Sequence, residues 1–170
     1  MSMDYVDGVD LAMLMRHHFK LHLLLPPQIA MFIVSRIARA LEYAHQWIVH
    51  KDVTPGNILI SSEGVPKLTD FGIAAPLADA GEEFAGKVHY MAPEQLARQR
   101  IDGRADIFSL GVVAYELLTG INLFKPLSKG SWDENVKWVK QAQSRPILPP
   151  HEVCPDLPER LSQLVMKMLE

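Results

Sequence analysis

The sequence predicts a mainly α fold with short β-hairpins. Two segments carry apolar side chains at helical spacing, one at Ile29, Ile33, Ile37, Leu41 and Ala44 and the other between residues 107 and 118. Two short runs with strand character, 58–60 and 67–69, flank the turn Ser61-Ser62-Glu63-Gly64. Such runs around a turn with glycine are typical of a tight hairpin.

The composition limits the classes of protein to which the chain can belong. The chain has 170 residues, of which 48% are hydrophobic and 22% are charged, so it can bury a core. Its net charge of −3 gives no reason to expect nucleic acid as a partner. A single cysteine, Cys154, excludes an internal disulfide framework and suits the cytoplasm. The apolar stretch 21–44 contains Pro26, Pro27, Arg36 and Arg39, so we expect no membrane contact by this segment.

Polar residues that a hairpin does not need lie at both of its ends. Asp52 and Asn57 precede the hairpin and Asp70 follows it, so the turn brings Asn57 and Asp70 close together. Oxygen ligands from Asn and Asp suit Mg²⁺ beside substrate phosphates. Asp52 is placed to orient or deprotonate an attacking hydroxyl group.

These residues belong to a larger set of motifs. The set comprises His50-Lys51-Asp52, Asn57, Asp70-Phe71-Gly72, Ala92-Pro93-Glu94 and Asp106-Ile107-Phe108-Ser109-Leu110-Gly111. In this order and spacing the chain resembles a eukaryotic-like serine/threonine protein kinase of the bacterial type. The resemblance implies a protein-kinase-like fold and transfer of the ATP γ-phosphoryl group to protein hydroxyls, with Mg²⁺ as cofactor.

The resemblance also assigns roles to single residues. Asp52 is expected to be the catalytic base, with Asn57 and Asp70 as Mg²⁺ ligands. Leu59 is expected to pack under adenine. Residues 1–9 resemble the hinge between kinase lobes, where the expected adenine contacts are Met3, Asp4, Tyr5 and Val6.

The family pattern covers the chain as one partial kinase domain, residues 1–170. By the resemblance, residues 10–170 are expected to correspond to the helical large (C-terminal) lobe, truncated before its last helices. We expect the N-terminal lobe to be absent from these residues, since they contain no Gly-x-Gly-x-x-Gly run and none of the lysine and glutamate motifs that the family places before the hinge. We therefore expect these residues alone to be inactive. The alternative is a non-catalytic, pseudokinase-like binding or regulatory module.

Two residue types are exchanged relative to the common family pattern. Thr54 occupies the position of a phosphate-contacting lysine, and Lys87 follows Gly86 where threonine is usual. The resemblance places both positions beside Asp52, so Lys87 is expected to supply the charge and Thr54 the hydroxyl. The rival interpretation is a decayed pseudokinase, although decay would more often remove Asp52, Asn57 or Asp70.

The segment between Asp70 and Tyr90 contains no Ser, Thr or Tyr, so phosphorylation within it is not the activating switch. Lys51 stands where relatives carry a phosphate-binding arginine. We hypothesise that Glu83 pairs with Lys51 as a permanent substitute for that phosphate. The alternative is two separate surface charges.

The remaining expectations concern the scaffold. The resemblance implies that Asp106 holds the catalytic-loop backbone. His45 should be structural, while Trp47 and Ile48 should lie in the core. Without its usual arginine partner, Glu94 should be exposed, protonated or bound to water.

Helix caps are expected at Asp10 and at Ser131 or Asp133. The last helix should turn Leu161, Leu164, Val165 and Met168 to the core, and the surface should hold His17, His18 and His22, rather than a metal site.

Overall fold

The structure is a computed structural model that describes residues 5–71, 87–125 and 130–170. The helices are α1 (Leu11–Lys20), α2 (Pro27–Ala44), α3 (Pro93–Leu96), α4 (Gly103–Thr119), α5 (Trp132–Gln143), α6 (Pro150–Val153) and α7 (Glu159–Met168). The strands are β1 (Gly8–Asp10), β2 (Ile58–Ser61) and β3 (Pro66–Leu68), and two 3₁₀ turns are η1 (Pro55–Asn57) and η4 (Val88–Tyr90). The mainly α prediction is confirmed.

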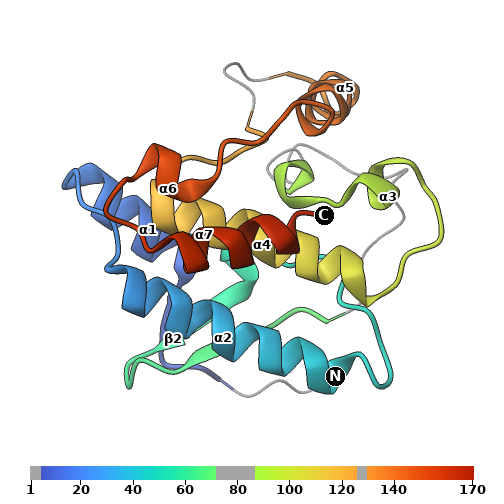
Figure 1. Cartoon of the computed structure of the whole chain (residues 1–170). Helices are drawn as coiled ribbons and strands as arrows, with labels where there is room; N and C mark the ends of the chain where they lie inside the picture. Colours follow the sequence, from blue (N-terminus) through green and yellow to red (C-terminus); the bar gives the residue numbers. More distant parts are fainter. Residues whose placement is uncertain (1–4, 72–86, 126–129) are drawn as a thin grey trace.

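Helix α4 is the central element of the fold. It contacts both α2 and α7, running behind α7 and above α2 in Figure 1, and it is buried on nearly all sides. Asp102 caps its start by accepting a hydrogen bond from Arg104 N at 2.9 Å, and Gly120 ends it with a φ of 74°. A Cβ at Gly111 would lie 2.9 Å from Met168 Cβ, so glycine permits the close approach of α7.

Helix α2 buries the predicted stripe from Ile33 onward. Ile29 is 47% exposed instead, whereas its neighbour Ala30, in the same first turn, is fully buried and begins the buried face. The prediction that Trp47 and Ile48 lie in the core is wrong, since they are 68% and 44% exposed. The helix ends at Ala44, so the following turn carries Trp47 off the buried face and against Tyr43, at a ring distance of 4.9 Å.

The three strands form one antiparallel sheet in the order β1-β2-β3. Ile58 pairs with Leu68 and Ile60 with Pro66, which confirms the predicted hairpin. Gly64 closes its turn with a φ of 78°. Strand β1 adds to the other edge through Gly8 and Ser61, and it leads directly into α1, which Asp10 caps by accepting a hydrogen bond from Met13 N at 2.7 Å.

In the C-terminal helices the predicted cap is confirmed, but the predicted buried face is only partly correct. Ser131 caps α5 in a reciprocal pair with Glu134, as predicted. On α7, Val165 is buried but Leu164 is 48% exposed, so that part of the prediction is wrong.

His17 and His22 are exposed and His18 is half-buried on α1 or just after it. No helix in the described ranges combines the length and apolar character that crossing a membrane requires.

Candidate active site

The loop from His50 to Asn57 is fixed in place by the contacts of its first residue, His50. His50 is fully buried, and its ring Nε2 donates to Thr69 O at 2.8 Å, while Nδ1 accepts from Asp52 N at 3.2 Å. This pair of bonds assigns the neutral Nε2–H tautomer. The ring also meets Phe71 edge-on, at a centroid distance of 4.6 Å. His50 thus ties the loop to the strand end that precedes Asp70.

Asp106, in the first turns of α4, anchors the same loop by its backbone. Its side chain is buried, and its carboxylate accepts from His50 N at 2.7 Å and from Lys51 N at 2.6 Å. Lys51 adopts a φ of 66°, a left-handed conformation that costs a non-glycine residue energy. The two charge-assisted bonds offset that cost. The scaffold role predicted for Asp106 agrees with this geometry.

Sequence reasoning missed a second clamp on the loop. Gln95 is buried, donates from Nε2 to Lys51 O at 2.9 Å and accepts from Ala92 N through Oε1 at 2.9 Å. The side chain therefore joins the loop to the start of α3. Its position three residues after Ala92, at the start of a short helix, was the available signal.

Asp52 and Asn57 are brought together by the η1 turn. Asn57 Nδ2 donates to both the backbone O and the side-chain Oδ2 of Asp52, each at 2.8 Å. Asn57 is buried, and its backbone accepts from Thr69 N at 3.0 Å. Because the amide nitrogen is committed to Asp52, the amide oxygen Oδ1 is the atom available to a further ligand.

Lys87 reaches the same carboxylate from a distant part of the chain. Its Nζ donates to Asp52 Oδ2 at 2.5 Å, with the two side chains 33% and 20% exposed. The fully buried Val88, the first residue of η4, fixes the position of this lysine. Thr54, two residues after Asp52, is buried. The positions that were predicted to be exchanged thus both lie at the Asp52 loop.

The other predicted site residues are less closely gathered. Asp70 is exposed, has a φ of 62° and follows the hairpin end at which Thr69 bonds Asn57, so both proposed metal ligands lie at that end. Leu59 is half-buried on β2. Tyr5 is 89% exposed and Val6 is half-buried. Met3, Asp4 and Glu83 lie outside the described residues.

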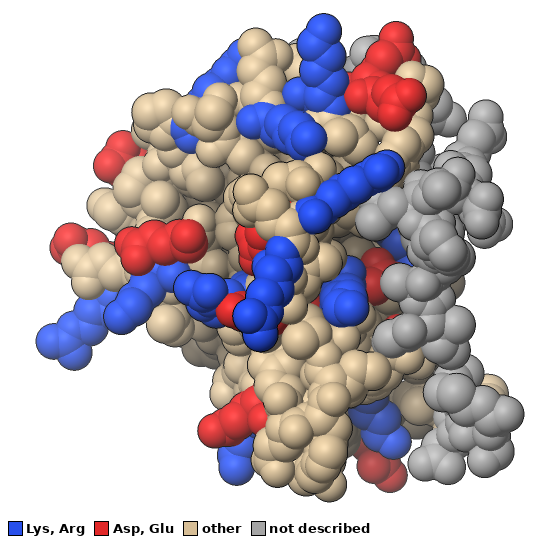
Figure 2. All heavy atoms as spheres, turned by 90° about the vertical axis from the view of Figure 1, so that its right-hand side faces the viewer, with Lys and Arg blue, Asp and Glu red and all other residues tan. Residues whose placement is uncertain are grey.

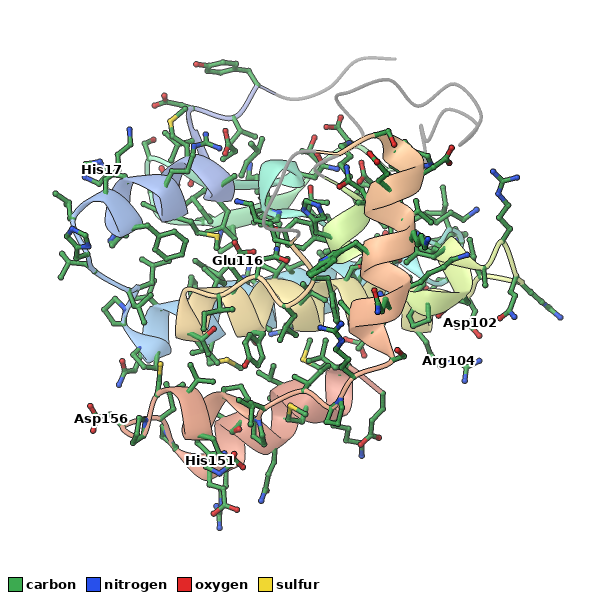
Figure 3. All side chains as sticks on the ribbon, turned by 90° about the horizontal axis from the view of Figure 1, so that it is seen from above. His17, Asp102, Arg104, Glu116, His151 and Asp156 are labelled. Carbon is green, nitrogen blue, oxygen red and sulfur yellow. The ribbon has the colours of Figure 1, made fainter. Side chains whose placement is uncertain are left out.

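Behind η4, a polar cluster joins this segment to α4. Tyr90 Oη donates to Glu116 Oε2 at 2.7 Å, and Asn122 Nδ2 donates to the same oxygen at 2.9 Å (Figure 3 labels Glu116). Burial, followed by the charge of Glu116, raises the pKa of Tyr90 far above its ordinary value. The phenol therefore remains a hydrogen-bond donor.

Next to this cluster, His89 is buried, and its Nε2 has no partner among the described residues. Burial, with a smaller contribution from the charge of Lys125, lowers the pKa of His89 to about 4. The imidazole is therefore neutral near pH 7.

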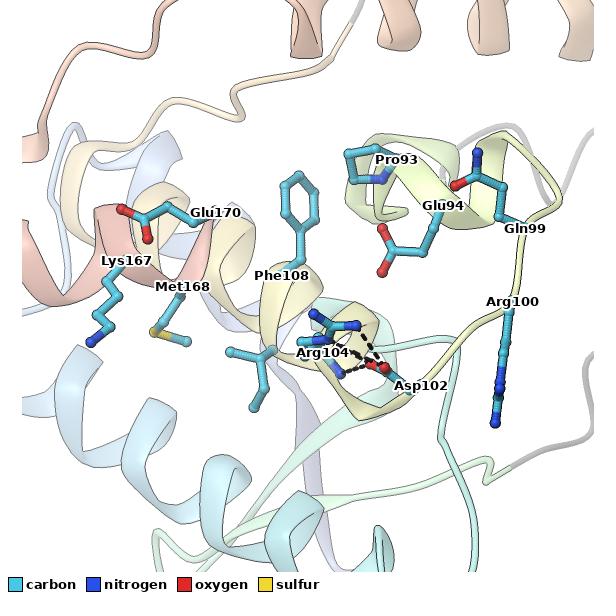
Figure 4. A pocket seen from close by; sticks show the side chains of 11 residues that line it. Pro93, Glu94, Gln99, Arg100, Asp102, Arg104, Phe108, Lys167, Met168 and Glu170 are labelled. Carbon is cyan, nitrogen blue, oxygen red and sulfur yellow. Dashed lines mark hydrogen bonds and ion pairs between the residues drawn. The ribbon is translucent and has the colours of Figure 1, made fainter.

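Two cavities lie near these elements. One of about 300 Å³ is bordered by Pro55, Tyr90 and Glu116, and one of about 580 Å³ lies between α3, α4 and α7 (Figure 4). Glu94 lines the larger cavity and is half-buried.

The surface in Figure 2, the right-hand side of Figure 1, mixes Lys and Arg with Asp and Glu.

Comparison with known proteins agrees with the motif analysis. Residues 1–170 match the family described as "Protein kinase domain". The probable serine/threonine-protein kinase CPE1738 of Clostridium perfringens is 38% identical over 99% of this chain and 24% of its own length. Serine/threonine-protein kinase PknB of Mycolicibacterium smegmatis is 36% identical over 98% of this chain and 26% of its own.

A solved structure gives the corresponding likeness in three dimensions. The crystal structure of the Mycobacterium tuberculosis PknI kinase domain aligns with a TM-score of 0.71 at 32% identity. The alignment covers 98% of this chain and 55% of that one. The chain thus spans about a quarter of the length of the two curated relatives and just over half of the solved kinase domain.

Proposed function

The chain belongs to the protein kinase domain family, and we propose that it forms the hinge and large lobe of a bacterial serine/threonine protein kinase. The reaction is transfer of the ATP γ-phosphoryl group to a hydroxyl of a protein substrate. The observation that carries the proposal is the cluster in which Lys87 and Asn57 both donate to Asp52 Oδ2.

In this proposal Asp52 orients the substrate hydroxyl and accepts its proton. Two donors hold Oδ2, while among the described residues Oδ1 accepts no hydrogen bond. The carboxylate is therefore oriented by one oxygen and free to receive a hydroxyl proton on the other. Positioning of this kind supplies much of the rate enhancement in phosphoryl transfer.

Asn57 and Asp70 are the residues that would hold Mg²⁺. An amide oxygen and a carboxylate form the hard, oxygen-rich donor set that this ion prefers, and the orientation of the Asn57 amide presents oxygen rather than nitrogen. When bound, ATP would supply the phosphoryl group and Mg²⁺ would neutralise part of its charge. The fit of the donor set supports ATP and Mg²⁺ as the cofactors.

Lys87 is proposed to take the place of the phosphate-contacting lysine, with the Thr54 hydroxyl in the position left by threonine. Support comes from the contact of Lys87 with Asp52 and from the burial of Thr54 in the same loop. A cation beside the base stabilises negative charge that develops on the transferred group.

For the nucleotide base, we propose that residues 1–9, including Met3, Asp4, Tyr5 and Val6, form the hinge, with Leu59 beneath adenine. Strand β1 supports this assignment because it joins residues 8–10 to the strand that carries Leu59, in the register Asp10 to Leu59. Residues 10–170 are then the large lobe.

The test is phosphoryl transfer by the full-length gene product, measured with radiolabelled ATP and a generic protein substrate. We expect transfer to Ser or Thr that requires Mg²⁺ and is lost in Asp52→Asn. Lys67→Ala, at an exposed position on β3, is the matched control and should retain the wild-type rate. A wild-type protein that binds partners but transfers no phosphate would overturn the proposal in favour of the non-catalytic binding module.

A further inference from the structure

The loop that joins α1 to α2 exposes several leucine side chains. Leu21 and Leu23 are each 55% exposed and Leu24 is 40% exposed, whereas Leu25, the next residue, is buried. Figure 1 shows this loop at the left-hand edge of the molecule. Single exposed leucines are ordinary in proteins, but contiguous ones on one loop indicate an interaction surface.

Backbone hydrogen bonds hold the loop in one shape. Leu23 N donates to His18 O at 3.0 Å, and His22 N donates to Phe19 O at 3.1 Å. This pair of bonds forms a Schellman turn, in which His22 takes the left-handed position with a φ of 56°. An apolar residue at the place of Leu23 commonly packs back on the helix in such a turn, but here it is exposed. The loop therefore presents its leucines without a further cost of ordering.

The end of α4 extends the apolar surface of the loop. A Cβ at Gly120 would lie 3.0 Å from Leu24 Cδ2 and 3.7 Å from Phe19 Cε1, so the loop packs against the C-terminal end of α4. Ile121, which follows Gly120, is 49% exposed. The loop surface is defined here as Leu21, Leu23, Leu24 and Ile121.

The charges near the loop surface are mainly positive. Residues 11–41 include Lys and Arg but no Asp or Glu, although the whole chain has a net charge of −3. Arg16 and Lys20, both on α1, are exposed. The acid that lines a cavity with Arg16 is Glu116, which is half-buried and already accepts two hydrogen bonds. This distribution of charge favours an anionic partner.

We propose that the loop surface binds peripherally to an anionic lipid bilayer. The leucines enter the boundary between headgroups and acyl chains, and Arg16 and Lys20 lie beside the lipid phosphates. Buried apolar area and attraction between cations and anionic lipids are the two contributions that drive such binding. The leucines project from an edge rather than line either cavity described above, which suits a broad surface. This interaction goes beyond the proposed function and does not depend on it.

The structure thus changes an expectation drawn from the sequence. Pro26 and Pro27 exclude a helix that spans the bilayer, and for that reason we expected no membrane contact. Contact with the bilayer surface needs only the exposed loop. A second copy of the chain is a poorer partner, because a symmetric contact would bring Arg16 and Lys20 close to their own counterparts.

Vesicle sedimentation with the full-length gene product tests the leucines. We expect tighter binding to phosphatidylcholine vesicles that contain phosphatidylglycerol than to phosphatidylcholine alone. Leu21→Ser/Leu23→Ser should lower the partition coefficient about 10- to 100-fold, because each leucine loses the transfer of about half its surface out of water. Leu148→Ser/Leu164→Ser, at leucines that are 61% and 48% exposed elsewhere, is the matched control and should bind as the wild type does.

A second pair of variants tests the charges. Arg16→Gln/Lys20→Gln should weaken binding to the anionic vesicles about 10- to 30-fold and leave binding to phosphatidylcholine unchanged. Lys137→Gln/Lys140→Gln, at exposed positions on α5, is the control and should bind as the wild type does. Raising the ionic strength should remove the preference for anionic vesicles. A wild type without that preference would contradict the proposal.

A tryptophan in the loop reports on this contact alone, whatever else the gene product touches. Leu23→Trp keeps an apolar side chain, and lipids brominated in their acyl chains should quench the emission that it adds. Leu148→Trp should add emission that these lipids do not quench. Absence of quenching at position 23 overturns the proposal. If Leu21→Ser/Leu23→Ser also abolishes self-association without vesicles, the surface belongs to a second copy instead.

Discussion

Tyr90 donates its phenol hydrogen to Glu116 at 2.7 Å, across 26 positions of sequence. The bond fastens the segment that follows Lys87 to the central helix α4, and Asn122 supports it through the same oxygen. Since Val88 and Tyr90 are both in η4, the position of Lys87 depends on this attachment.

Tyr90→Phe should therefore destabilise the protein. A hydrogen bond to a charged group is worth about 1.5–3 kcal/mol, and its loss leaves the half-buried Glu116 with Asn122 as its donor. Urea unfolding measures the change. Tyr43→Phe, at a residue that is 67% exposed, is the matched control and should lie within about 0.5 kcal/mol of the wild type. Equal midpoints for the two variants would contradict the prediction.

Lys87→Ala should lower kcat of the full-length gene product about 100-fold or more, the usual effect of removing one preorganised donor from a charged transition state. Lys87→Arg should retain part of the activity, because the charge remains although the contact with Asp52 changes shape. Initial rates at saturating ATP provide the measurement. An alanine variant with the wild-type rate would show that the contact with Asp52 contributes nothing to catalysis.

Restoring the common family arrangement provides a sharper test of the exchange. Lys87→Thr alone should be nearly inactive, and Thr54→Lys alone should bring two cations to one carboxylate. The double variant should transfer phosphate faster than Lys87→Thr, because the lysine again lies beside Asp52. A double variant no better than Lys87→Thr would show that the positions are not interchangeable, as would be the case if the buried Thr54 site cannot admit the longer chain.

His89 should make stability depend on pH between its ordinary pKa of 6.5 and its lowered value of about 4. In this range the unfolded chain binds a proton that the folded protein does not, so stability falls as the pH falls. Between pH 7 and pH 5 the loss from this residue is about 2 kcal/mol. Urea unfolding of wild type and His89→Gln should show the smaller pH dependence in the variant. Parallel pH profiles would contradict the assignment.

Gly111→Ala should destabilise the protein although alanine favours helices. The added Cβ would lie 2.9 Å from Met168 Cβ and 3.1 Å from Leu169 Cδ2, so α7 must move away from α4. Overpacking of this kind costs about 1–3 kcal/mol. Thermal unfolding gives the comparison, and a variant with a raised Tm would show that α7 shifts without cost.

Local signals predicted the elements that carry the site. The turn at residues 61–64 identified the hairpin, and the caps Asp10 and Ser131 identified two helix starts, because each involves neighbours in sequence. The anchoring bonds of Asp106 were expected from the family resemblance alone. Residues 50 and 106 are 56 positions apart, and no periodicity connects them.

Features that depend on tertiary packing were missed. Trp47 was assigned to the core by its apolar character, but the end of α2 at Ala44 turns it outward. The position of Gln95 signals a local bond to Ala92 but not burial, and His89 carries no local signal at all, because α3, α4 and η4 cover these side chains only after the chain folds. Leu164 fits the apolar spacing of α7, yet it lies beyond the edge of the face against α4.

The place of Lys87 changes how the charge at Asp52 is obtained. A lysine at position 54 would accompany the aspartate from the moment the loop forms, being two residues away. Here the cation comes from a residue 35 positions along the chain. Asp52 therefore gains its positive neighbour only once η4 has docked on α4 through Val88 and Tyr90. The positive charge beside Asp52 therefore depends on whether a segment distant in sequence has reached its folded position.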